Sequence, residues 1–243
     1  PTKIMLKIKN LTIEDEDNKY VDNLTLETNP GELHAVIGLP GAGKSFIAHA
    51  IFGNPELAIT SGEILFKNKS LAKKSMADRS KLGIFTSFQD PPMLSGVTNF
   101  ELIRAVAAAN KDKRTSNELT AAFKELCKSL GLSSSHGSKV LDPDDIVDTR
   151  KNEMLQLLLL NPKLFVLDEI DDGLEADDMQ VIGDHLNTFM TSTKVGIILT
   201  KNPAFLDIIN PTHVHVMVNG ILATLDTPDL YKRFIIDDYS QFL

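Results

Sequence analysis

The chain has 243 residues, of which 42% are hydrophobic and 24% charged, and its formal net charge is −8. This length and composition suit one large α/β domain, or a core that carries a sizeable insertion. The acidic balance disfavours nucleic acid or an anionic membrane surface as the main partner. No apolar run reaches the ~18 residues that a membrane-spanning helix needs, so direct membrane insertion is not expected.

The chain contains a single cysteine, Cys127. One cysteine excludes an internal disulfide, and it excludes a zinc site or iron cluster held only by cysteines of this chain. Cys127 shares a stripe of helical spacing with Leu119, Phe123 and Leu130. This pattern predicts a thiol buried in an apolar core.

The N-terminal third predicts strands before a first helix. Residues 4–37 alternate in strand fashion, with turns at 14–18 and 29–32. Residues 33–37 form a short apolar strand, and residues 45–52 form a helix after a glycine-rich turn. Further strands are expected at 62–66 and 82–89.

The glycine-rich turn fits the phosphate-binding pattern G-x-x-x-x-G-K-[ST], known as Walker A or the P-loop. It consists of Gly38, Leu39, Pro40, Gly41, Ala42, Gly43, Lys44 and Ser45. Glycines let backbone N–H groups curl around phosphates, and the dipole of the following helix favours an anion. Lys44 supplies positive charge for the terminal phosphates, and Ser45 offers a hydroxyl to Mg²⁺. The strand–loop–helix context disfavours a chance glycine turn.

The rest of the chain alternates helices and strands. Helices are expected at 99–109, 116–130, 151–160 and 177–190, with a polar loop at 133–148. Apolar strands are expected at 163–169 and 195–200. Residues 213–218 and 221–225 form a hairpin with an Asn-Gly turn, and a last helix begins after Thr227-Pro228. Buried parallel strands between helices indicate an α/β core with helices inserted in the middle and antiparallel strands flanking it.

Two acids at the end of strand 163–169 complete a nucleotide site. Four apolar residues deliver Asp168 to the carboxyl end of a buried strand, as in a Walker B motif, where it would hold Mg²⁺. Glu169 would accept a proton from the attacking water. Gln89 ends its own strand and could reach both Mg²⁺ and the water, although polar strand ends are usually only solvated. Tyr20 could stack on an adenine, with surface packing an equal alternative.

This order of motifs resembles the ATP-binding cassette (ABC) ATPases. More specific runs look like SufC, the ATPase family of SUF iron–sulfur cluster assembly, and the similarity covers nearly the whole chain. The first run is Gly83-Ile84-Phe85 with Phe88-Gln89, Pro91, Gly96-Val97 and Asn99 after it. The other runs are Lys151–Gln156, Leu167–Asp171, Gly173-Leu174 and Val214–Val216. The resemblance implies ATP and Mg²⁺ as ligands and a RecA-like P-loop core with an antiparallel β-subdomain and a helical subdomain.

The resemblance also implies boundaries and partners. The expected single domain covers 1–243, with the β-subdomain and P-loop core at 1–89, the helical subdomain at 90–161, and the Walker B core with the hairpin and last helix at 162–243. Implied partners are scaffold proteins of the SufB and SufD type, together with a second ATPase head in a homodimer or heterodimer. The implied location is the cytosol, or the plastid stroma if a transit peptide was removed.

The chain departs from the family at the parts that act between two heads. Asp145, Ile146, Val147 and Asp148 stand where the Ser-Gly-Gly-Glu signature should begin. A carboxylate ~4 Å from a phosphate charge costs about 4 kcal/mol at an effective dielectric near 20, which exceeds a typical hydrogen-bond gain.

Three further residues depart from the family pattern. Lys201 replaces the switch histidine, so it could contact a γ-phosphate but could not accept and return a proton. Asp172 and Phe46 also replace residues usual in the family. We therefore expect ATP binding with weak hydrolysis as a homodimer.

Three functions stay open at this stage. The first is a SUF-type ATPase, which the retained Glu169 favours. The second is a regulatory nucleotide-binding subunit without turnover, which the altered signature and Lys201 favour. The third is the ATPase motor of an ABC transporter, which the runs Asn152–Gln156 and Glu169–Asp171 disfavour. The sequence contains no plausible set of iron ligands.

Overall fold

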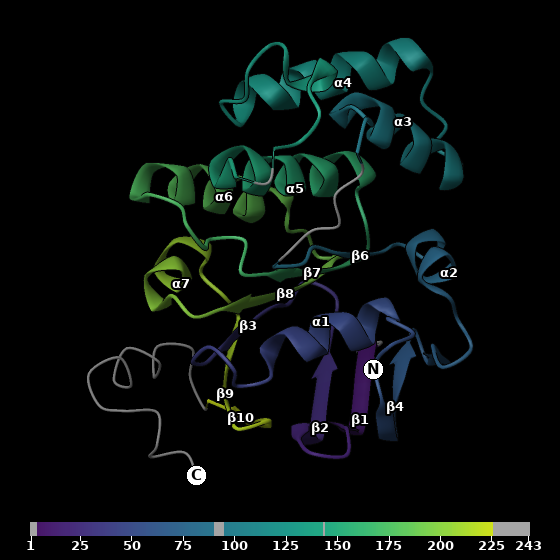
Figure 1. Cartoon of the computed structure of the whole chain (residues 1–243), viewed down its shortest axis with the longest axis vertical. Coiled ribbons are helices and arrows are strands. Elements are labelled where there is room, and N and C mark those ends of the chain that lie inside the picture. The colour runs from purple at the N-terminus through teal and green to yellow at the C-terminus, as the bar shows by residue number, and fades with distance from the viewer. Residues whose placement is uncertain (1–3, 90–94, 143, 226–243) are drawn as a thin grey trace.

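The computed structural model describes residues 4–89, 95–142 and 144–225. Within these residues, two sheets and their helices stack in layers (Figure 1). Helix α1 (Lys44–Phe52) lies between the sheets, and the other long helices lie beyond the larger sheet. The helix expected after Thr227 falls outside the described residues.

The larger sheet carries the ends of the strands that matter for nucleotide binding. Its strand order is β10-β9-β3-β8-β7-β6, parallel except for the β9–β10 hairpin. The strands are β3 (Leu33–Ile37), β6 (Ile84–Thr86), β7 (Leu164–Asp168), β8 (Val195–Thr200), β9 (His213–Val218) and β10 (Ile221–Thr224). Strand β3 lies between β8 and β9, and β7 lies on the far side of β8, so the loops after β3 and β7 open at the same edge.

The side chains of β7 point alternately to the two faces of the larger sheet, and both faces are covered by a hydrophobic core. Leu164 and Val166 pack into the core that includes α1, whereas Phe165 and Leu167 pack into the core beneath the helical layer. A strand buried on both faces is continuously apolar, as residues 164–167 are. The same packing fixes the direction in which Asp168 leaves the sheet.

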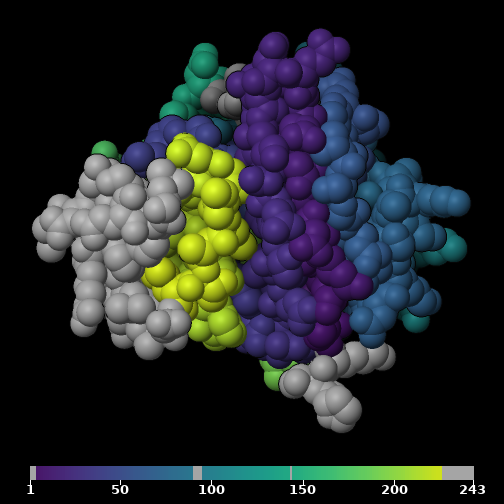
Figure 2. Space-filling model, turned by 90° about the horizontal axis from the view of Figure 1, so that it is seen from below, coloured from purple at the N-terminus to yellow at the C-terminus, as the bar shows by residue number. Residues whose placement is uncertain are grey.

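The smaller sheet is antiparallel, with the order β2-β1-β4-β5. Its strands are β1 (Leu6–Glu14), β2 (Lys19–Thr28), β4 (Ile59–Phe66) and β5 (Lys69–Ser70). Figure 2 shows the β9–β10 hairpin, in yellow, beside the purple N-terminal strands. The N–H of Asp22 in β2 donates to the carbonyl of Gly220 in the hairpin turn at 2.9 Å, which links the two sheets.

The helices begin where the sequence supplies caps. Thr98 with Glu101 and Thr115 with Glu118 form capping boxes, in which each side chain satisfies a free N–H of the first turn. The helices beyond α1 are α2 (Met76–Lys81), α3 (Asn99–Ala109), α4 (Ser116–Ser129), α5 (Ile146–Leu160), α6 (Ala176–Phe189) and α7 (Pro203–Ile209), with a 3₁₀ turn, η1 (His136–Ser138). In the described part of the chain, no helix has the length and apolarity needed to cross a bilayer.

Several sequence predictions are confirmed and several boundaries were wrong. Cys127 is buried, as expected, and burial raises the pKa of its thiol to about 11. The strand expected at 82–89 is only the three residues of β6. Helix α5 begins at Ile146, within the expected loop, because the Asp145 side chain accepts the N–H of Asp148 at 3.0 Å and caps the helix. Helices α2 and α7 and strand β5 were missed, although Asn202 and Pro203 form a recognisable start for α7.

Candidate nucleotide site

The P-loop runs from the end of β3 to the first turn of α1. Gly43 precedes the helix with φ of 104°, and a Cβ there would lie 2.3 Å from the backbone oxygen of Tyr20. A Cβ on Gly38 would lie 2.4 Å from the oxygen of Met217. Both positions therefore require glycine for space, and Gly43 also requires it for its backbone conformation. The result is a loop wrapped around the helix N-terminus, where phosphates bind readily.

Lys44 points its ammonium group into this loop. The Nζ donates to the carbonyls of Gly38 at 2.7 Å and Leu39 at 3.1 Å, and it lies 3.8 Å from Oε1 of Glu169. Burial lowers the pKa of Lys44, while the charges of Glu169 and Asp168 act in the opposite direction. A buried ammonium beside two acids is placed to meet the negative charge of a nucleotide.

Asp168 ends β7 with only 1% of its surface exposed. Neither carboxylate oxygen has a hydrogen-bond partner among the described residues. Burial raises the pKa of Asp168 to about 6, against the opposing effects of the Ser45 hydroxyl and the Lys44 charge. An unpartnered buried carboxylate next to a serine hydroxyl suits Mg²⁺, which prefers oxygen ligands.

Glu169 occupies a strained turn directly after β7. Its φ is 51°, in the left-handed region, which costs a non-glycine residue ~1–2 kcal/mol. The turn is held by the Glu169 N–H, which donates to the Leu199 carbonyl at 2.8 Å. This backbone aims the carboxylate between two ammonium groups, since Oε1 faces Lys44 at 3.8 Å and Oε2 faces Lys201 at 3.4 Å.

Lys201 follows β8 and pairs with two acids. Its Nζ lies 2.9 Å from Oδ1 of Asp172 and 3.4 Å from Oε2 of Glu169. The hydrogen bond to Asp172 raises the pKa of Lys201 above its ordinary value. Lys201 is therefore a permanent cation at neutral pH. Sequence reasoning singled out Lys201 and Asp172 separately, but it did not pair them.

A second buried acid, Asp171, was missed as a site residue. The Thr200 hydroxyl donates to its Oδ2 at 2.8 Å, and burial raises the pKa of Asp171 to about 6. This contact ties the turn after β7 to the end of β8. An acid three residues beyond Asp168 carried no signal of burial in the sequence.

Gln89 is exposed at the end of the β6 segment, and its backbone rather than its side chain is held. Arg150 of α5 donates to the carbonyls of Gln89 at 3.1 Å and Phe88 at 3.4 Å, and it pairs with Glu153 at 3.1 Å. Within the described residues, no hydrogen bond or ion pair joins Gln89 to Asp168 or Glu169. The i,i+3 spacing of Arg150 and Glu153 was a usable signal that the sequence analysis overlooked.

Tyr20 and Phe46 lie together at the side of the P-loop. Their rings stack with centroids 4.3 Å apart. Phe46 therefore covers one face of Tyr20, and a stacked base would have to use the other face. The role of either ring in adenine binding stays a prediction.

The residues at the expected signature position form the exposed start of α5. Asp145 is the helix cap and is exposed, whereas Asp148 is half-buried and lies 3.7 Å from Nδ1 of His136. Ile146 is 46% exposed, and its Cγ2 would lie 2.8 Å from a Cβ on Gly173. The exposed acid Asp145 and the branched apolar side chain of Ile146 thus occupy the expected signature position.

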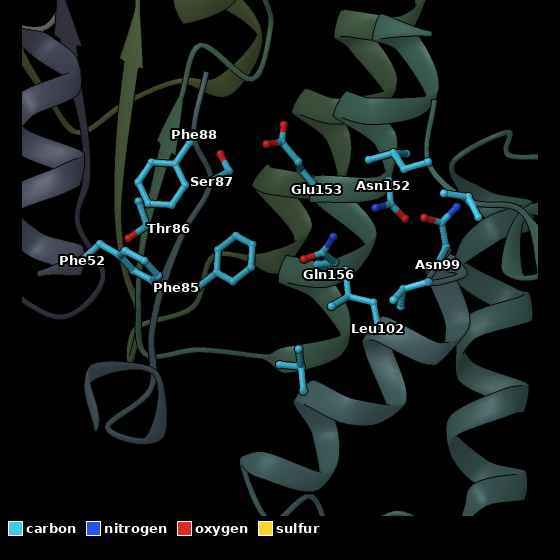
Figure 3. Close-up of a pocket in the computed structure, with 14 residues that line it drawn as sticks. Phe52, Phe85, Thr86, Ser87, Phe88, Asn99, Leu102, Asn152, Glu153 and Gln156 are labelled. Carbon is cyan, nitrogen blue, oxygen red and sulfur yellow. The ribbon is translucent and has the colours of Figure 1, made fainter. Parts of the chain in front are cut away.

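A cavity of about 350 Å³ lies beside the Gln89 segment, between the larger sheet and helices α3 and α5 (Figure 3). Phe85, Phe88 and Phe52 line one side, and Asn152, Glu153 and Gln156 of α5 line the other. Burial raises the pKa of Glu153 to about 7, against the charge of Arg150. The cavity is mostly apolar, with a few polar groups.

The fold and site define a P-loop nucleotide-binding ATPase cassette. The chain belongs to the ABC transporter family, whose sequence model matches residues 21–171. A relative called probable ATP-dependent transporter ycf16, from Antithamnion sp., is 36% identical over 90% of this chain and 89% of its own. A probable ABC transporter ATP-binding protein of Streptococcus pyogenes is 33% identical over 97% of this chain and 94% of its own.

Solved structures agree on the fold. The ADP conformation of MJ1267, an ATP-binding cassette of an ABC transporter, has a TM-score of 0.75 at 24% identity and covers 97% of this chain and 96% of its own. A dimeric post-hydrolysis structure of the cassette MJ0796, bound to ADP and phosphate, has a TM-score of 0.77 at 17% identity, covering 91% and 99%. The predicted ABC ATPase fold is thereby confirmed.

Proposed function

We propose that this chain is an ATP-binding ABC subunit of the SufC type that hydrolyses ATP slowly when it pairs with itself. The proposal treats residues 1–243 as one cassette. The observation that carries it is the position of Glu169, whose carboxylate lies between the ammonium groups of Lys44 and Lys201.

The binding half of the proposal follows from the P-loop and Asp168. The N–H groups of the loop and Lys44 would bind the β- and γ-phosphates of ATP. Ser45, Asp168 and Gln89 would hold Mg²⁺, which neutralises phosphate charge when bound. Tyr20 and Phe46 would flank the base on one side of the loop.

The slow hydrolysis follows from the pairing of Glu169. As general base, this carboxylate must accept a proton from water. Lys201 lies 3.4 Å from Oε2 and Lys44 lies 3.8 Å from Oε1, so a water molecule must displace an ion pair to reach either carboxylate oxygen. Lys201 can also contact a γ-phosphate as a charge, but it cannot relay a proton. At the opposing head, exposed Asp145 and Ile146 would replace the serine and glycines that complete a neighbour's site.

The binding half is tested by the variant Lys44→Ala. We expect its affinity for a fluorescent ATP analogue with Mg²⁺ to fall at least tenfold, because a buried charge that meets the phosphates is removed. Lys69→Ala, at an exposed lysine of β5, is the matched control and should bind normally. Unchanged affinity in Lys44→Ala would refute the nucleotide site.

The catalytic half is tested by steady-state phosphate release. The purified chain should turn over far more slowly than an ordinary cassette, and adding a cassette with an intact signature should raise the rate. Glu169→Gln should abolish whatever turnover remains. Rapid turnover by the chain alone, lost in Glu169→Gln, would contradict the proposed impairment.

The assignment to iron–sulfur assembly has its support in the SufC-like runs, which include Asn152–Gln156 and Asp168–Asp171. We propose partners of the SufB and SufD type, seated at the cavity beside Gln89, in the cytosol or a plastid. A transporter motor is the second candidate, because the relatives carry names such as probable ATP-dependent transporter.

Co-purification from native lysate discriminates these partners. A scaffold protein without membrane spans, retained by the wild-type chain and lost in Phe85→Asp, supports assembly of iron–sulfur clusters. A membrane permease retained in the same way supports the transporter. Recovery of the chain alone under native conditions would contradict both partner assignments.

A further inference from the structure

A cluster of histidines lies at the end of the larger sheet opposite the P-loop. His34 is the second residue of β3, whose other end leads into the P-loop, and it pairs in register with His213 at the start of β9. Their rings stack with centroids 4.4 Å apart. Glu32 completes the group, because its Oε2 lies 2.9 Å from Nε2 of His34.

These three residues bring metal ligands together. One ligand atom from each of Glu32, His34 and His213 lies within 4.8 Å of the others. Two ligands of a tetrahedral zinc ion lie about 3.4 Å apart, given Zn–N and Zn–O distances of ~2.0–2.1 Å. Closure from a separation of up to 4.8 Å therefore needs a shift of at most about 1.4 Å and a turn of the His213 ring out of its stack. His213 is only half-buried, so that turn is available to it.

Hydrogen bonds constrain which ring nitrogen of each histidine carries a proton. The Thr212 hydroxyl donates to the Leu33 carbonyl at 3.0 Å, so it accepts from Nδ1–H of His213 at 2.9 Å. This tautomer leaves the lone pair of His213 on Nε2. Nδ1 of His34 lies 2.9 Å from Nε2 of His215, whose Nδ1 meets the Thr224 hydroxyl at 2.8 Å. Nε2 of His34 donates to Oε2 of Glu32 at 2.9 Å, and an ion would take the place of this proton. The chain of partners beyond Nδ1 then lets His34 keep a proton on Nδ1 and present Nε2 to the ion.

The carboxylate is held in the same way. The backbone N–H of Asn29 donates to Oε2 of Glu32 at 2.7 Å, and the Asn29 amide donates to Oε1 at 2.9 Å. Metal ligands are commonly fixed by such outer hydrogen bonds. Glu32 and His213 are half-buried while His34 is buried, so an ion could enter from solvent.

We propose that Glu32, His34 and His213 form a binding site for a divalent transition metal of the Zn²⁺ class. Two imidazoles and one carboxylate suit zinc and disfavour Mg²⁺ or Ca²⁺, which prefer oxygen ligands alone. The three protein ligands would leave a fourth position for water. Because Glu32 and His213 come from opposite ends of the chain, a bound ion would tie the start of β3 to the start of β9.

The test uses the full chain with Co²⁺ and Zn²⁺ as probes, in excess Mg²⁺ to occupy the Asp168 site. One Co²⁺ per chain should bind with the visible absorption of tetrahedral nitrogen and oxygen ligation, and Zn²⁺ should displace it. His213→Gln and Glu32→Gln should each weaken binding at least tenfold. His185→Gln, at a histidine of α6 outside the cluster, is the matched control and should bind as the wild type does.

A second measurement guards against misfolded variants. Zn²⁺ should raise the thermal unfolding midpoint of the wild type but not that of His213→Gln, while both bind nucleotide equally. The proposal is overturned if metal binding does not saturate at one ion, or if it survives unchanged in His213→Gln and Glu32→Gln. In either case the cluster is only a hydrogen-bonded network within the sheet.

Discussion

Replacing Asp168 with asparagine should separate the stability of the fold from its function. The carboxylate is 1% exposed and has no hydrogen-bond partner among the described residues, so keeping it ionised opposes folding. Its pKa is raised to about 6 from the ordinary value of 3.8. The folded state therefore holds the proton more tightly than the unfolded chain does.

The size of the effect follows from linkage. A shift of about two pKa units, at 1.36 kcal/mol each, lowers the free energy of unfolding by roughly 3 kcal/mol above pH ~6. Because the folded pKa is raised, this deficit is fully present above pH ~6 and disappears as the pH falls towards ~4. The substitution Asp168→Asn removes the charge but leaves an amide without partners, which costs about 1–3 kcal/mol at every pH.

The free energies of unfolding of the wild type and of Asp168→Asn, measured in urea at pH ~7.5 and ~4.5, test this pH dependence of stability. We expect the stability of the variant relative to the wild type to fall by about 2 kcal/mol between the two pH values. Mg²⁺-ATP should stabilise the wild type and have little effect on the variant. Glu125→Gln, at an exposed acid of α4, should show neither effect. A pH-independent difference, or equal stabilisation by Mg²⁺-ATP, would refute this account of Asp168.

Three further outcomes are expected. Lys201→His should raise steady-state phosphate release several-fold, because it replaces the permanent cation beside Oε2 of Glu169 with a group that can relay a proton; a lower rate would contradict this. Burial lowers the pKa of His215 to about 3, so the stability from its neutral ring is complete above pH ~6.5 and is lost as the pH falls towards ~3. In acid titrations followed by circular dichroism, His215→Asn should therefore flatten the pH dependence between those values, and an unchanged curve would count against it. Cys127 should react with a thiol reagent only after denaturation, because its pKa is about 11 and it is buried; rapid labelling of the native chain would disprove this.

Much of the fold was predictable because its signals are local. A continuous apolar run marked β7, helical patterns marked α3 and α4, and an Asn-Gly turn marked the β9–β10 hairpin. The errors came where local signals are weak. Only three residues of the expected strand at 82–89 pair in register with β7, and an aspartate cap extended α5 into a polar stretch that resembled a loop.

The nucleotide site also has one part that the sequence predicted and one part that only the folded structure revealed. The P-loop and the acids after β7 could be identified from the residues alone, because glycine, lysine and carboxylate at set spacings admit few other uses. Which charges and rings meet became known only from the folded chain: Lys201 contacts Glu169 and Asp172, and His34 stacks on His213. Such pairs join strands far apart in the chain, and their distances depend on how the sheet is assembled, which no local pattern encodes.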